Sequence, residues 1–475
     1  MQRQTKIIAT MGPSVASPGK VRELIDAGMD VARLNFSHGG HDLHRQFFDW
    51  IRTAAAESGR TVAIMQDIQG PKLRVGKFPG GMIELHTDTE IDLLPESGSG
   101  SHERIPIGYE SLLTDVSPGD RVILDDGLVS CEVVGRSDNA LRARVVTGGS
   151  LSDHKGVAFP DSNLTVGNIT PKDEADLAFG RELGVDFVAA SFVRTGPDVE
   201  AVAALAGDVP IIAKIELAQA LDNLDDILKA SFGVMVARGD LGVQLPLDRL
   251  PLIQADIIRR ANAGGRVSVT ATEMLESMTH SPRPTRAEVT DVAHAVMSGT
   301  DAVMLSGETA IGDFPAKTVQ AMAQICQTIE DGTLSRETPV PFVGGENDVA
   351  SAVAQAATQI AKNVGARTIV AFTESGSTAR LISKYRPTQR VVAFTPNTTT
   401  RRRMALYWGI QPHAFERKDY TDDEMAAAAE ILEAEGVATA GEAVVMVGGV
   451  PPNVRAATNL VKVHQIGELA GALGG

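Results

Sequence analysis

The stretch Ile211-Ile-Ala-Lys-Ile-Glu216 and the later stretch Val234-Met-Val-Ala-Arg-Gly-Asp240 set the pattern on which this chain is built. Each is a short apolar run that ends in charged or glycine residues, and a helical pattern lies between them. Six more runs of this kind occur, at residues 6–10, 31–36, 62–67, 187–193, 267–272 and 302–306. Near-continuous apolar runs separated by helices are typical of buried parallel strands. Eight strand–helix units predict an α/β fold, namely a (β/α)8 or TIM barrel.

The connection between the third and fourth runs is too long for such a barrel. It takes up residues 68–186, whereas one strand–helix unit needs about 30–40 residues. Short alternating segments at 82–86, 121–124 and 141–146, with turn signals between them, indicate β-strands instead. We therefore expect a small inserted β-barrel domain at 70–167. Because barrel active sites lie at the carboxyl ends of the strands, this insert would cap the site as a lid.

The last part of the chain repeats an α/β pattern. A helical segment at 349–364 precedes apolar runs at 368–373, 390–394, 443–447 and 460–464, and a capping box, Thr421-Asp-Asp-Glu424, predicts the start of an alanine-rich helix. We expect a separate α/β domain at 341–475. The barrel would then comprise residues 1–69 and 168–340.

Composition excludes several classes of function. The 475 residues include 60 acidic and 44 basic ones, for a formal net charge of −16, and only 4% are aromatic. A polyanion would meet a repulsive field, so we expect no nucleic-acid partner and no membrane-surface partner. Two cysteines, Cys131 and Cys326, fit a reducing compartment. With no signal-peptide pattern and no long apolar run, the sequence predicts a cytoplasmic protein.

Charged side chains gather at the predicted carboxyl ends of the strands. Lys214 and Glu216 are two residues apart on one strand, so they point the same way, and Asp240 ends the next strand. Two carboxylates at neighbouring strand ends suit Mg²⁺ or Mn²⁺. A Lys–Glu ion pair beside a turn-capping aspartate is the structural alternative. Lys214 could stabilise an enolate or a transferring phosphoryl group, or form a Schiff base, as in an aldolase, if burial removed its proton.

Polar residues near two other strand ends indicate phosphate binding. Arg33, Asn35 and Ser37 alternate along one strand end and can share a face, and Arg74 follows the third run. The planar fork of arginine suits phosphate. Surface arginines and turn residues are the alternative explanation, and His38 alone carries little weight.

Long, ordered stretches of the chain resemble the pyruvate kinase family. The matching motifs are Thr5-Lys-Ile-Ile-Ala-Thr-Met-Gly-Pro-Ser14, Ala32-Arg-Leu-Asn-Phe-Ser-His-Gly39, Gly70-Pro-Lys-Leu-Arg74, Asp125-Asp-Gly-Leu128, His154-Lys-Gly-Val157, Ile212-Ala-Lys-Ile-Glu216, Val236-Ala-Arg-Gly-Asp-Leu-Gly242, Ala271-Thr-Glu-Met-Leu-Glu-Ser-Met278, Pro284-Thr-Arg-Ala-Glu288 and Met304-Leu-Ser-Gly-Glu-Thr-Ala310. The resemblance implies a glycolytic phosphotransferase that moves the phosphoryl group of phosphoenolpyruvate to ADP, giving pyruvate and ATP. It also implies a homotetramer.

The resemblance assigns roles position by position. The implied catalytic residues are Lys214, Thr272, Arg33 and Ser306. The implied substrate-binding residues are Arg33, Gly239, Asp240 and Thr272, and the implied ligands of Mg²⁺ or Mn²⁺ are Glu216 and Asp240. The implied nucleotide contacts are Asn35, His38, Arg74 and, from the insert, Lys155. Phosphoryl transfer of this kind depends on positioning and electrostatic stabilisation, and closure of the insert would exclude water.

Three departures from the family pattern matter. Lys72 stands where many members have a glutamate beside a bound K⁺, although the residues that match the K⁺ ligands, Asn35, Ser37 and Asp67, are present. A lysine ammonium is a fixed monovalent cation, so we expect that K⁺ is not required. Leu43 replaces a nucleotide-stacking tyrosine, and Ala158-Phe-Pro-Asp161 departs from the common sequence at the junction of insert and barrel.

A hydroxyl-rich turn in the last domain indicates an anion site. Thr373, Ser375, Gly376, Ser377 and Thr378 lie between a predicted strand and helix, where a helix N-terminus favours anions. A simple capped turn is the alternative. In the family this loop holds a phosphate of an effector; here the pattern for fructose 1,6-bisphosphate is incomplete. Arg401-Arg-Arg403 offers counter-charge, so a sugar phosphate or AMP is the expected activator.

Two rival functions remain open from the sequence. The first is a metal-dependent aldolase or lyase that acts through a pyruvate enolate, and the second is a catalytically silent effector-binding protein.

Overall fold

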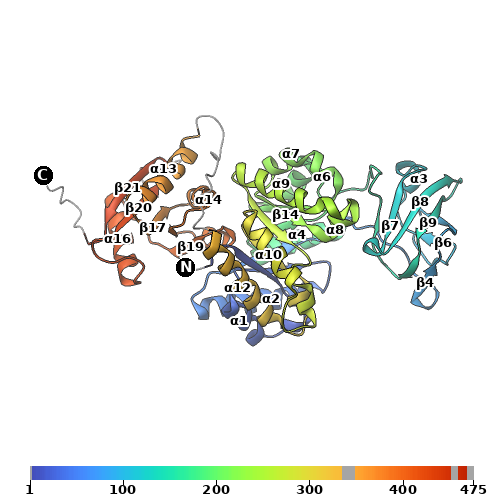
Figure 1. The fold of residues 1–475 in the computed structure, drawn as a ribbon, viewed down its shortest axis with the longest axis horizontal. Coiled ribbons are helices and arrows are strands. Elements are labelled where there is room, and N and C mark those ends of the chain that lie inside the picture. Colours follow the sequence, from blue (N-terminus) through green and yellow to red (C-terminus); the bar gives the residue numbers. More distant parts are fainter. Residues whose placement is uncertain (1–2, 334–347, 451–457, 468–475) are drawn as a thin grey trace.

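The centre of the molecule is a closed barrel of eight parallel strands. The computed structural model describes residues 3–333, 348–450 and 458–467 (Figure 1). The strand order is β1-β16-β15-β14-β13-β12-β3-β2. The strands are β1 (Lys6–Thr10), β2 (Val31–Asn35), β3 (Ala63–Asp67), β12 (Phe187–Ala190), β13 (Ile211–Ile215), β14 (Gly233–Ala237), β15 (Val267–Ala271) and β16 (Ala302–Leu305). All eight predicted runs are strands of this barrel, so the predicted fold class is confirmed.

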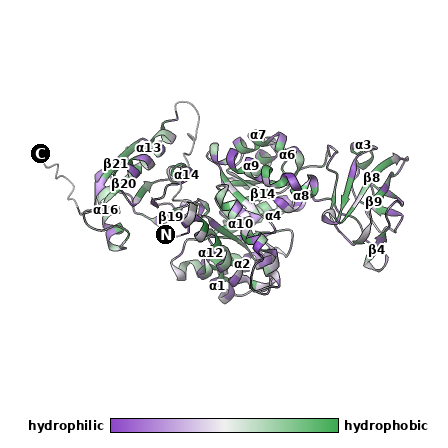
Figure 2. Ribbon diagram, viewed as in Figure 1, coloured by the Kyte–Doolittle hydropathy of each residue, from purple (hydrophilic) through white to green (hydrophobic). Residues whose placement is uncertain are grey.

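Helices surround the barrel, because alternate strand residues face outward and need apolar cover. Ile7 and Ala9 pack on this outer side, whereas Ile8 lies in the barrel interior. The surrounding helices are α1 (Pro18–Ala27), α2 (His41–Ser58), α4 (Pro171–Leu183), α5 (Gly196–Ala206), α6 (Ala218–Asp222), α7 (Leu224–Ala230), α8 (Arg238–Gln244), α9 (Leu250–Ala263), α10 (Arg286–Met297), α11 (Gly307–Ala310) and α12 (Pro315–Thr333). Figure 2 shows the strands as mainly hydrophobic and the helices as mixed. In the described residues, no helix is both long and apolar enough to span a bilayer.

The residues between β3 and α4 form an almost entirely β-structured insert with its own core. Its strands are β4 (Met82–Leu85), β5 (Glu90–Leu94), β6 (Arg104–Pro106), β7 (Arg121–Leu124), β8 (Val129–Arg136), β9 (Leu141–Thr147), β10 (Gly149–Ser152) and β11 (Val157–Ala158), with one short helix, α3 (Leu112–Asp115). Six strands pair in the order β11-β7-β8-β9-β5-β6, and β10 pairs with β4. Leu93, Ile105 and Leu141 are fully buried among them.

The C-terminal residues form an α/β domain on the opposite side of the barrel from the insert (Figure 1). It contains α13 (Val349–Asn363), β17 (Thr368–Phe372), α14 (Ser377–Lys384), β18 (Arg390–Thr395), α15 (Thr398–Arg403), β19 (Ile410–Ala414), α16 (Thr421–Ala434), β20 (Ala443–Gly448) and β21 (Leu460–Gln465). The sheet order is β19-β18-β17-β20-β21, and only its β20–β21 pair is antiparallel.

Two details of this domain differ from the prediction or lie beyond the structure. The predicted capping box is wrong: α16 begins at Thr421, its N-cap is Tyr420, and the Glu424 backbone N–H donates to the Tyr420 carbonyl. Thr421 is thus inside the first turn, where its hydroxyl cannot serve as the cap. The predicted boundary between residues 340 and 341 lies outside the described residues.

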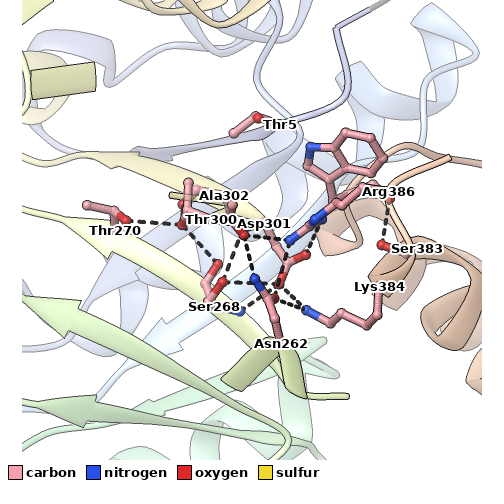
Figure 3. A network of polar contacts seen from close by, with 12 residues as sticks. Thr5, Asn262, Ser268, Thr270, Thr300, Asp301, Ala302, Ser383, Lys384 and Arg386 are labelled. Atoms are coloured by element: carbon pink, nitrogen blue, oxygen red, sulfur yellow. Dashed lines mark hydrogen bonds and ion pairs between the residues drawn. The ribbon is translucent and has the colours of Figure 1, made fainter. Parts of the chain in front are cut away.

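The C-terminal domain is joined to the amino-terminal end of the barrel by a buried polar network (Figure 3). Asp301 precedes β16; its carboxylate pairs with Lys384, and its Oδ1 lies 2.8 Å from Nη1 of Arg386. The backbone N–H of Ser268 in β15 also donates to Asp301, at 2.7 Å. Apolar packing continues across this junction, because the barrel interior and the last domain share one cluster that includes Met235 and Tyr407. We call this junction the seam.

Candidate active site

Lys214, Glu216 and Asp67 meet at the carboxyl end of the barrel. Lys214 Nζ lies 2.7 Å from Glu216 Oε1 and 3.3 Å from Asp67 Oδ1, and it donates to Ser191 Oγ at 2.7 Å. Burial alone would lower the pKa of Lys214, but the charges of Asp67 and Glu216 outweigh it and raise the pKa. The lysine therefore keeps its proton. A protonated amine cannot attack a carbonyl, which argues against the Schiff-base alternative.

Glu216 and Asp240 supply two carboxylates to one cleft. The Glu216 Oε2 accepts from the Phe192 backbone N–H at 2.6 Å, while Asp240 Oδ1 lies 2.9 Å from Lys72 Nζ. Burial and the charge of Asp240 raise the pKa of Glu216 against the pull of Lys214. Such crowding of negative charge fits a divalent cation. No three His, Cys, Asp or Glu side chains cluster as metal ligands among the described residues. Beside these two carboxylates, an ion would take water and substrate oxygens.

Arg33 is held in place by Asp67. Its Nε lies 2.6 Å from Asp67 Oδ2, and its Nη1 donates to Thr10 Oγ1 at 3.0 Å. Burial would raise the pKa of Asp67, but the Arg33 and Lys214 charges lower it, so this carboxylate stays ionised. Arg33 is almost fully buried, which restricts its rotamers and fixes the direction of its guanidinium group.

The residues that match a monovalent-cation site lie beside Arg33. The Ser37 backbone N–H donates to the Asn35 side-chain oxygen at 3.2 Å, and Asp67 is engaged by Arg33 and Lys214. Within the described residues, Lys72 contacts Asp240 and makes no hydrogen bond or ion pair with Asn35, Ser37 or Asp67.

Thr272 is held in a strained backbone conformation at the end of β15. Its φ is +68°, in the left-handed region that non-glycine residues rarely adopt. Its hydroxyl donates to the Ala271 carbonyl at 2.7 Å and accepts from the Gly239 N–H at 2.8 Å. Arg238 Nη2 donates to the Thr272 carbonyl at 2.6 Å, and Nη1 pairs with Asp291 at 2.6 Å. Nothing in the sequence indicated that Arg238 positions the backbone of Thr272.

The next strand end, at Ser306, is held by a buried carboxylate. Glu308 is fully buried; its Oε2 accepts from the Ser306 N–H at 2.6 Å, and its Oε1 accepts from the Leu275 N–H at 3.1 Å. Glu308 therefore ties the end of β16 to the loop after β15. The structure thus brings Thr272 and Ser306 onto neighbouring strands, whose pairing includes Thr270 with Val303.

The insert faces the barrel across a cleft. Barrel residues in its lining include Phe192, Glu216 and Asp240, and insert residues include Lys72 and Gly156. Two residues predicted to contact the nucleotide lie on the insert: Lys155 Nζ is 2.8 Å from Asp125 Oδ1, and Arg74 Nη1 donates to the His154 carbonyl at 2.9 Å.

On the barrel side of the site, His38 follows β2. Its backbone N–H donates to the Asn35 carbonyl at 3.2 Å, and its own carbonyl contacts His44 Nε2 at 3.0 Å. Leu43, where a stacking aromatic residue would be needed, is 36% exposed.

The hydroxyl-rich turn at 373–378 leads into α14. Thr373 Oγ1 accepts from the Gly376 N–H at 2.9 Å, and the Ser375 hydroxyl lies 3.1 Å from that of Ser377. Gly376 is the N-cap of α14, with φ +85° and no side-chain cap. Thr378 Oγ1 contacts Thr458 Oγ1 at 2.7 Å. We call residues 373–378 the effector turn; the nearby α15 carries Arg401, Arg402 and Arg403.

Comparisons with known proteins agree with this arrangement. The family model "Pyruvate kinase, barrel domain" matches residues 2–319, and "Pyruvate kinase, alpha/beta domain" matches residues 351–464. The pyruvate kinase of Corynebacterium glutamicum is 41% identical over 473 residues, which cover 98% of each chain. That of Geobacillus stearothermophilus is 42% identical over 481 residues, covering 99% of this chain and 81% of the relative. A solved pyruvate kinase from Cryptosporidium parvum matches with a TM-score of 0.90 at 36% identity, over 98% of this chain and 96% of that one.

A TIM barrel whose mouth gathers a protonated lysine, a buried arginine and two carboxylates beneath a β-structured insert defines a phosphotransferase. The chain belongs to the pyruvate kinase family. Its reaction is the transfer of the phosphoryl group from phosphoenolpyruvate to ADP, and the family generally needs a divalent metal ion.

Proposed function

We propose that the barrel mouth performs this transfer with Lys214 as its central cation. The observation that carries the proposal is the 2.7 Å contact between Lys214 and Glu216, with Arg33 oriented beside them by Asp67. Lys214 and Arg33 would stabilise the charge of the phosphoryl group in the transition state. Because both are buried and held by carboxylates, little reorganisation is needed when that charge develops.

Glu216 and Asp240 are proposed as the ligands of Mg²⁺ or Mn²⁺. The bound ion would supply charge neutralisation between substrate and phosphate oxygens. Lys72 contacts Asp240 in this structure. When the metal ion binds, Lys72 would have to share this carboxylate with the ion or move away from it.

Substrate orientation and protonation are assigned to the ends of β14 and β15. The Gly239 and Asp240 backbone and the Thr272 hydroxyl would receive the substrate carboxylate. Thr272 would also take part in the proton relay to the enolate carbon, with Ser306 behind it. The strained φ of Thr272 supports this, since such strain concentrates at functional sites.

Nucleotide binding is assigned to residues of both the insert and the barrel. Arg74 and Lys155 on the insert, with Asn35 and His38 on the barrel, would contact ADP. Closing the insert would bring the first pair to the second and exclude water.

Lys72 is proposed to make K⁺ unnecessary. It places a positive charge at the cleft, next to Asp240, where other family members would use an ion. The monovalent-cation ligands Asn35, Ser37 and Asp67 would then be retained without a bound ion.

The effector turn is proposed to bind the phosphate of a sugar phosphate or AMP and to activate the enzyme. Three features support this: a left-handed glycine at the N-cap, clustered hydroxyls and a helix N-terminus. We further propose a cytoplasmic homotetramer, with domains at 1–69 plus 168–340, 70–167 and 341–475.

One experiment separates this function from its rivals. Formation of ATP from phosphoenolpyruvate and ADP, coupled to pyruvate reduction, should be abolished by Lys214→Met and reduced by Arg33→Lys. An aldolase or lyase would instead cleave or form a carbon–carbon bond without ADP. A Lys214→Met variant with unchanged turnover would support a catalytically silent protein.

A further inference from the structure

Basic side chains occur in two parts of the seam between the barrel and the C-terminal domain. In the first part they pair with a carboxylate. At the start of β15 and β16, Lys384 and Arg386 are matched by the Asp301 carboxylate (Figure 3). Further along, near the starts of β13, β14 and β15, arginines from both domains gather. Arg266 precedes β15, Arg380 lies on α14, and Arg403 ends α15.

Among the described residues, none provides an acceptor for the five side-chain N–H groups of Arg380. Its guanidinium lies 5.3 Å from the centre of the Phe232 ring, and it makes no hydrogen bond or ion pair with any described residue. The side chain is half-buried. A guanidinium held on an aromatic face yet lacking acceptors is poised for a ligand that brings its own oxygens.

The other donors surround the same place. The Tyr407 ring stacks on Phe232 with centroids 5.9 Å apart. Arg380 and Tyr407 therefore share contact with the Phe232 ring. Burial raises the pKa of Tyr407 to about 12, and the charges of Arg380 and Arg403 oppose this rise. Arg266 lies beside Phe232, because the N–H of the next residue, Val267, donates to the Phe232 carbonyl at 3.4 Å. Burial and the Arg380 charge lower the pKa of Arg266.

Few groups in the seam satisfy these donors. Arg403 Nη2 donates to the Asp208 carbonyl at 2.9 Å, but its buried Nε has no partner among the described residues. Arg266 Nη2 donates to the Lys229 carbonyl at 3.0 Å. Asp186 and Asp208 are the carboxylates whose charges act on Arg403. Within the described residues, Arg266, Arg380 and Arg403 form no ion pair at 4.0 Å or less, although the chain as a whole has a net charge of −16.

We propose that Arg266, Arg380 and Arg403, with the Tyr407 hydroxyl, bind the phosphate group of a small molecule at the seam. A phosphate has several acceptor oxygens and more than one negative charge, which matches forked donors converging from two domains. The ligand would contact barrel and C-terminal domain together, so its binding would stabilise their junction in proportion to its occupancy.

This site is distinct from the effector turn, although it is close to it. A Cβ built on Gly376 would lie 3.1 Å from the Tyr407 hydroxyl oxygen, so the tyrosine lies directly beneath the turn. The turn offers hydroxyls and backbone N–H groups, whereas the seam offers guanidinium groups. The hydroxyls of the turn and the guanidinium groups of Arg266 and Arg380 can therefore be removed separately, whereas Arg403, on α15, is common to both assignments.

Trp408 gives a local readout. The chain has two tryptophans, and Trp408 adjoins Tyr407 in the seam, with Arg386 4.8 Å from its ring. In a Trp50→Phe background, inorganic phosphate is titrated at constant ionic strength while Trp408 fluorescence is followed. We expect a saturable change, with the apparent affinity at least about tenfold weaker in Arg380→Met and Arg266→Met, as for loss of one charge-assisted pair.

Matched variants identify where the phosphate binds. Arg367→Met, which removes an 88% exposed arginine of the same domain, should titrate like its parent. Ser377→Ala in the effector turn and Lys214→Met in the barrel mouth should also retain the signal. Without phosphate, Arg380→Met should unfold at the same or a higher temperature, because it removes an unpaired half-buried charge. Glycerol 3-phosphate in place of inorganic phosphate tests whether an ester is preferred.

Two results would overturn the proposal. One is equal phosphate affinity in Arg380→Met, Arg266→Met and Arg367→Met. The other is a signal that disappears in Ser377→Ala but persists in both seam variants, which would assign the phosphate to the effector turn and leave that earlier proposal standing.

Discussion

Arg238 holds Thr272 by its backbone: Nη2 of the arginine donates to the threonine carbonyl at 2.6 Å, and Nε donates to the preceding carbonyl of Ala271 at 3.1 Å. This pair of contacts stabilises a φ of +68° that threonine would otherwise leave, at a cost of about 1–3 kcal/mol. The guanidinium is itself fixed by Asp291. Arg238 is therefore a positioning residue for the hydroxyl that faces Gly239.

Replacing Arg238 should impair turnover more than substrate affinity. In Arg238→Met the Thr272 carbonyl loses its donor and the hydroxyl moves, and misplacement on an ångström scale reduces rates about a hundredfold. We expect a fall in kcat of roughly ten- to a hundredfold with a smaller change in the KM for phosphoenolpyruvate. Arg283→Met, at an exposed position after the same strand, is the control. Equal kcat in both variants would contradict the role.

Removing the Asp301 carboxylate should destabilise the protein in a pH-dependent manner. Asp301 is almost fully buried between Lys384 and Arg386, so Asp301→Asn leaves two cations without their anion, at a cost of about 3–5 kcal/mol. Burial would raise the pKa of Asp301, but Lys384 and Arg386 lower it below its usual value.

The sign of this pH dependence follows from that lowered pKa. A carboxyl with a lower pKa in the folded state stabilises the fold fully above its unfolded pKa of about 3.9 and loses this contribution as the pH falls through the folded value. The stability gap between the wild type and Asp301→Asn should thus be greatest near neutral pH and shrink below about pH 4. Urea unfolding at several pH values measures it; a gap that is constant down to acid pH would refute the assignment.

Lys72 should determine the response to monovalent cations. If its ammonium replaces K⁺, the KM for phosphoenolpyruvate will be the same in Na⁺ and K⁺ buffers. Lys72→Glu should lower activity in Na⁺ and regain it in K⁺, because a carboxylate and a monovalent ion then share the site. A wild-type enzyme whose KM rises sharply in Na⁺ and recovers in K⁺ would rule this out. Lys77→Glu on the insert controls for a general charge effect.

Gly12 is packed so closely that even one methyl group would disturb the site. A Cβ there would lie 2.5 Å from the Ala310 carbonyl oxygen, which ends the short helix after Ser306. Since the obstacle is backbone, Gly12→Ala should destabilise by about 1–3 kcal/mol and also lower kcat. Gly19→Ala is the matched control, because nothing lies within 4 Å of its Cβ position. Thermal unfolding of the two variants decides the point.

The barrel was predictable because buried parallel strands are apolar along their whole length. The same rule explains what was missed in the last domain: β19, Ile410–Ala414, is polar and contains Pro412, which an edge strand tolerates because its outer N–H groups need no partner. In the insert, β5, β6, β8, β10 and β11 escaped prediction. β6 has only three residues and β11 only two, which is too few to show a period. β8 does alternate, with Val129, Cys131 and Val133 buried, so its pattern was overlooked.

The candidate site likewise contains some residues that the sequence predicted and others that it did not. Lys214, Glu216 and Asp240 were found because strand ends of a barrel converge, a property of the fold class. Phe192 was missed because its contribution is a backbone N–H aimed at Glu216, and every residue other than proline has that group. Partners 83 residues apart, such as Asp301 and Lys384, likewise have no signal in the local sequence.

β3 and β12, the two strands on either side of the insert in the sequence, pair with each other in the barrel, and Met65 lies opposite Phe187. In a barrel without an insert, the chain between these two paired strands would be much shorter. Because the entropy of closing a loop grows only with the logarithm of its length, the longer connection costs only about 1 kcal/mol more. The inserted domain therefore adds little to the entropic cost of closing the barrel. The insert, with its own apolar core, can fold as an independent unit while the ring of strands is still open.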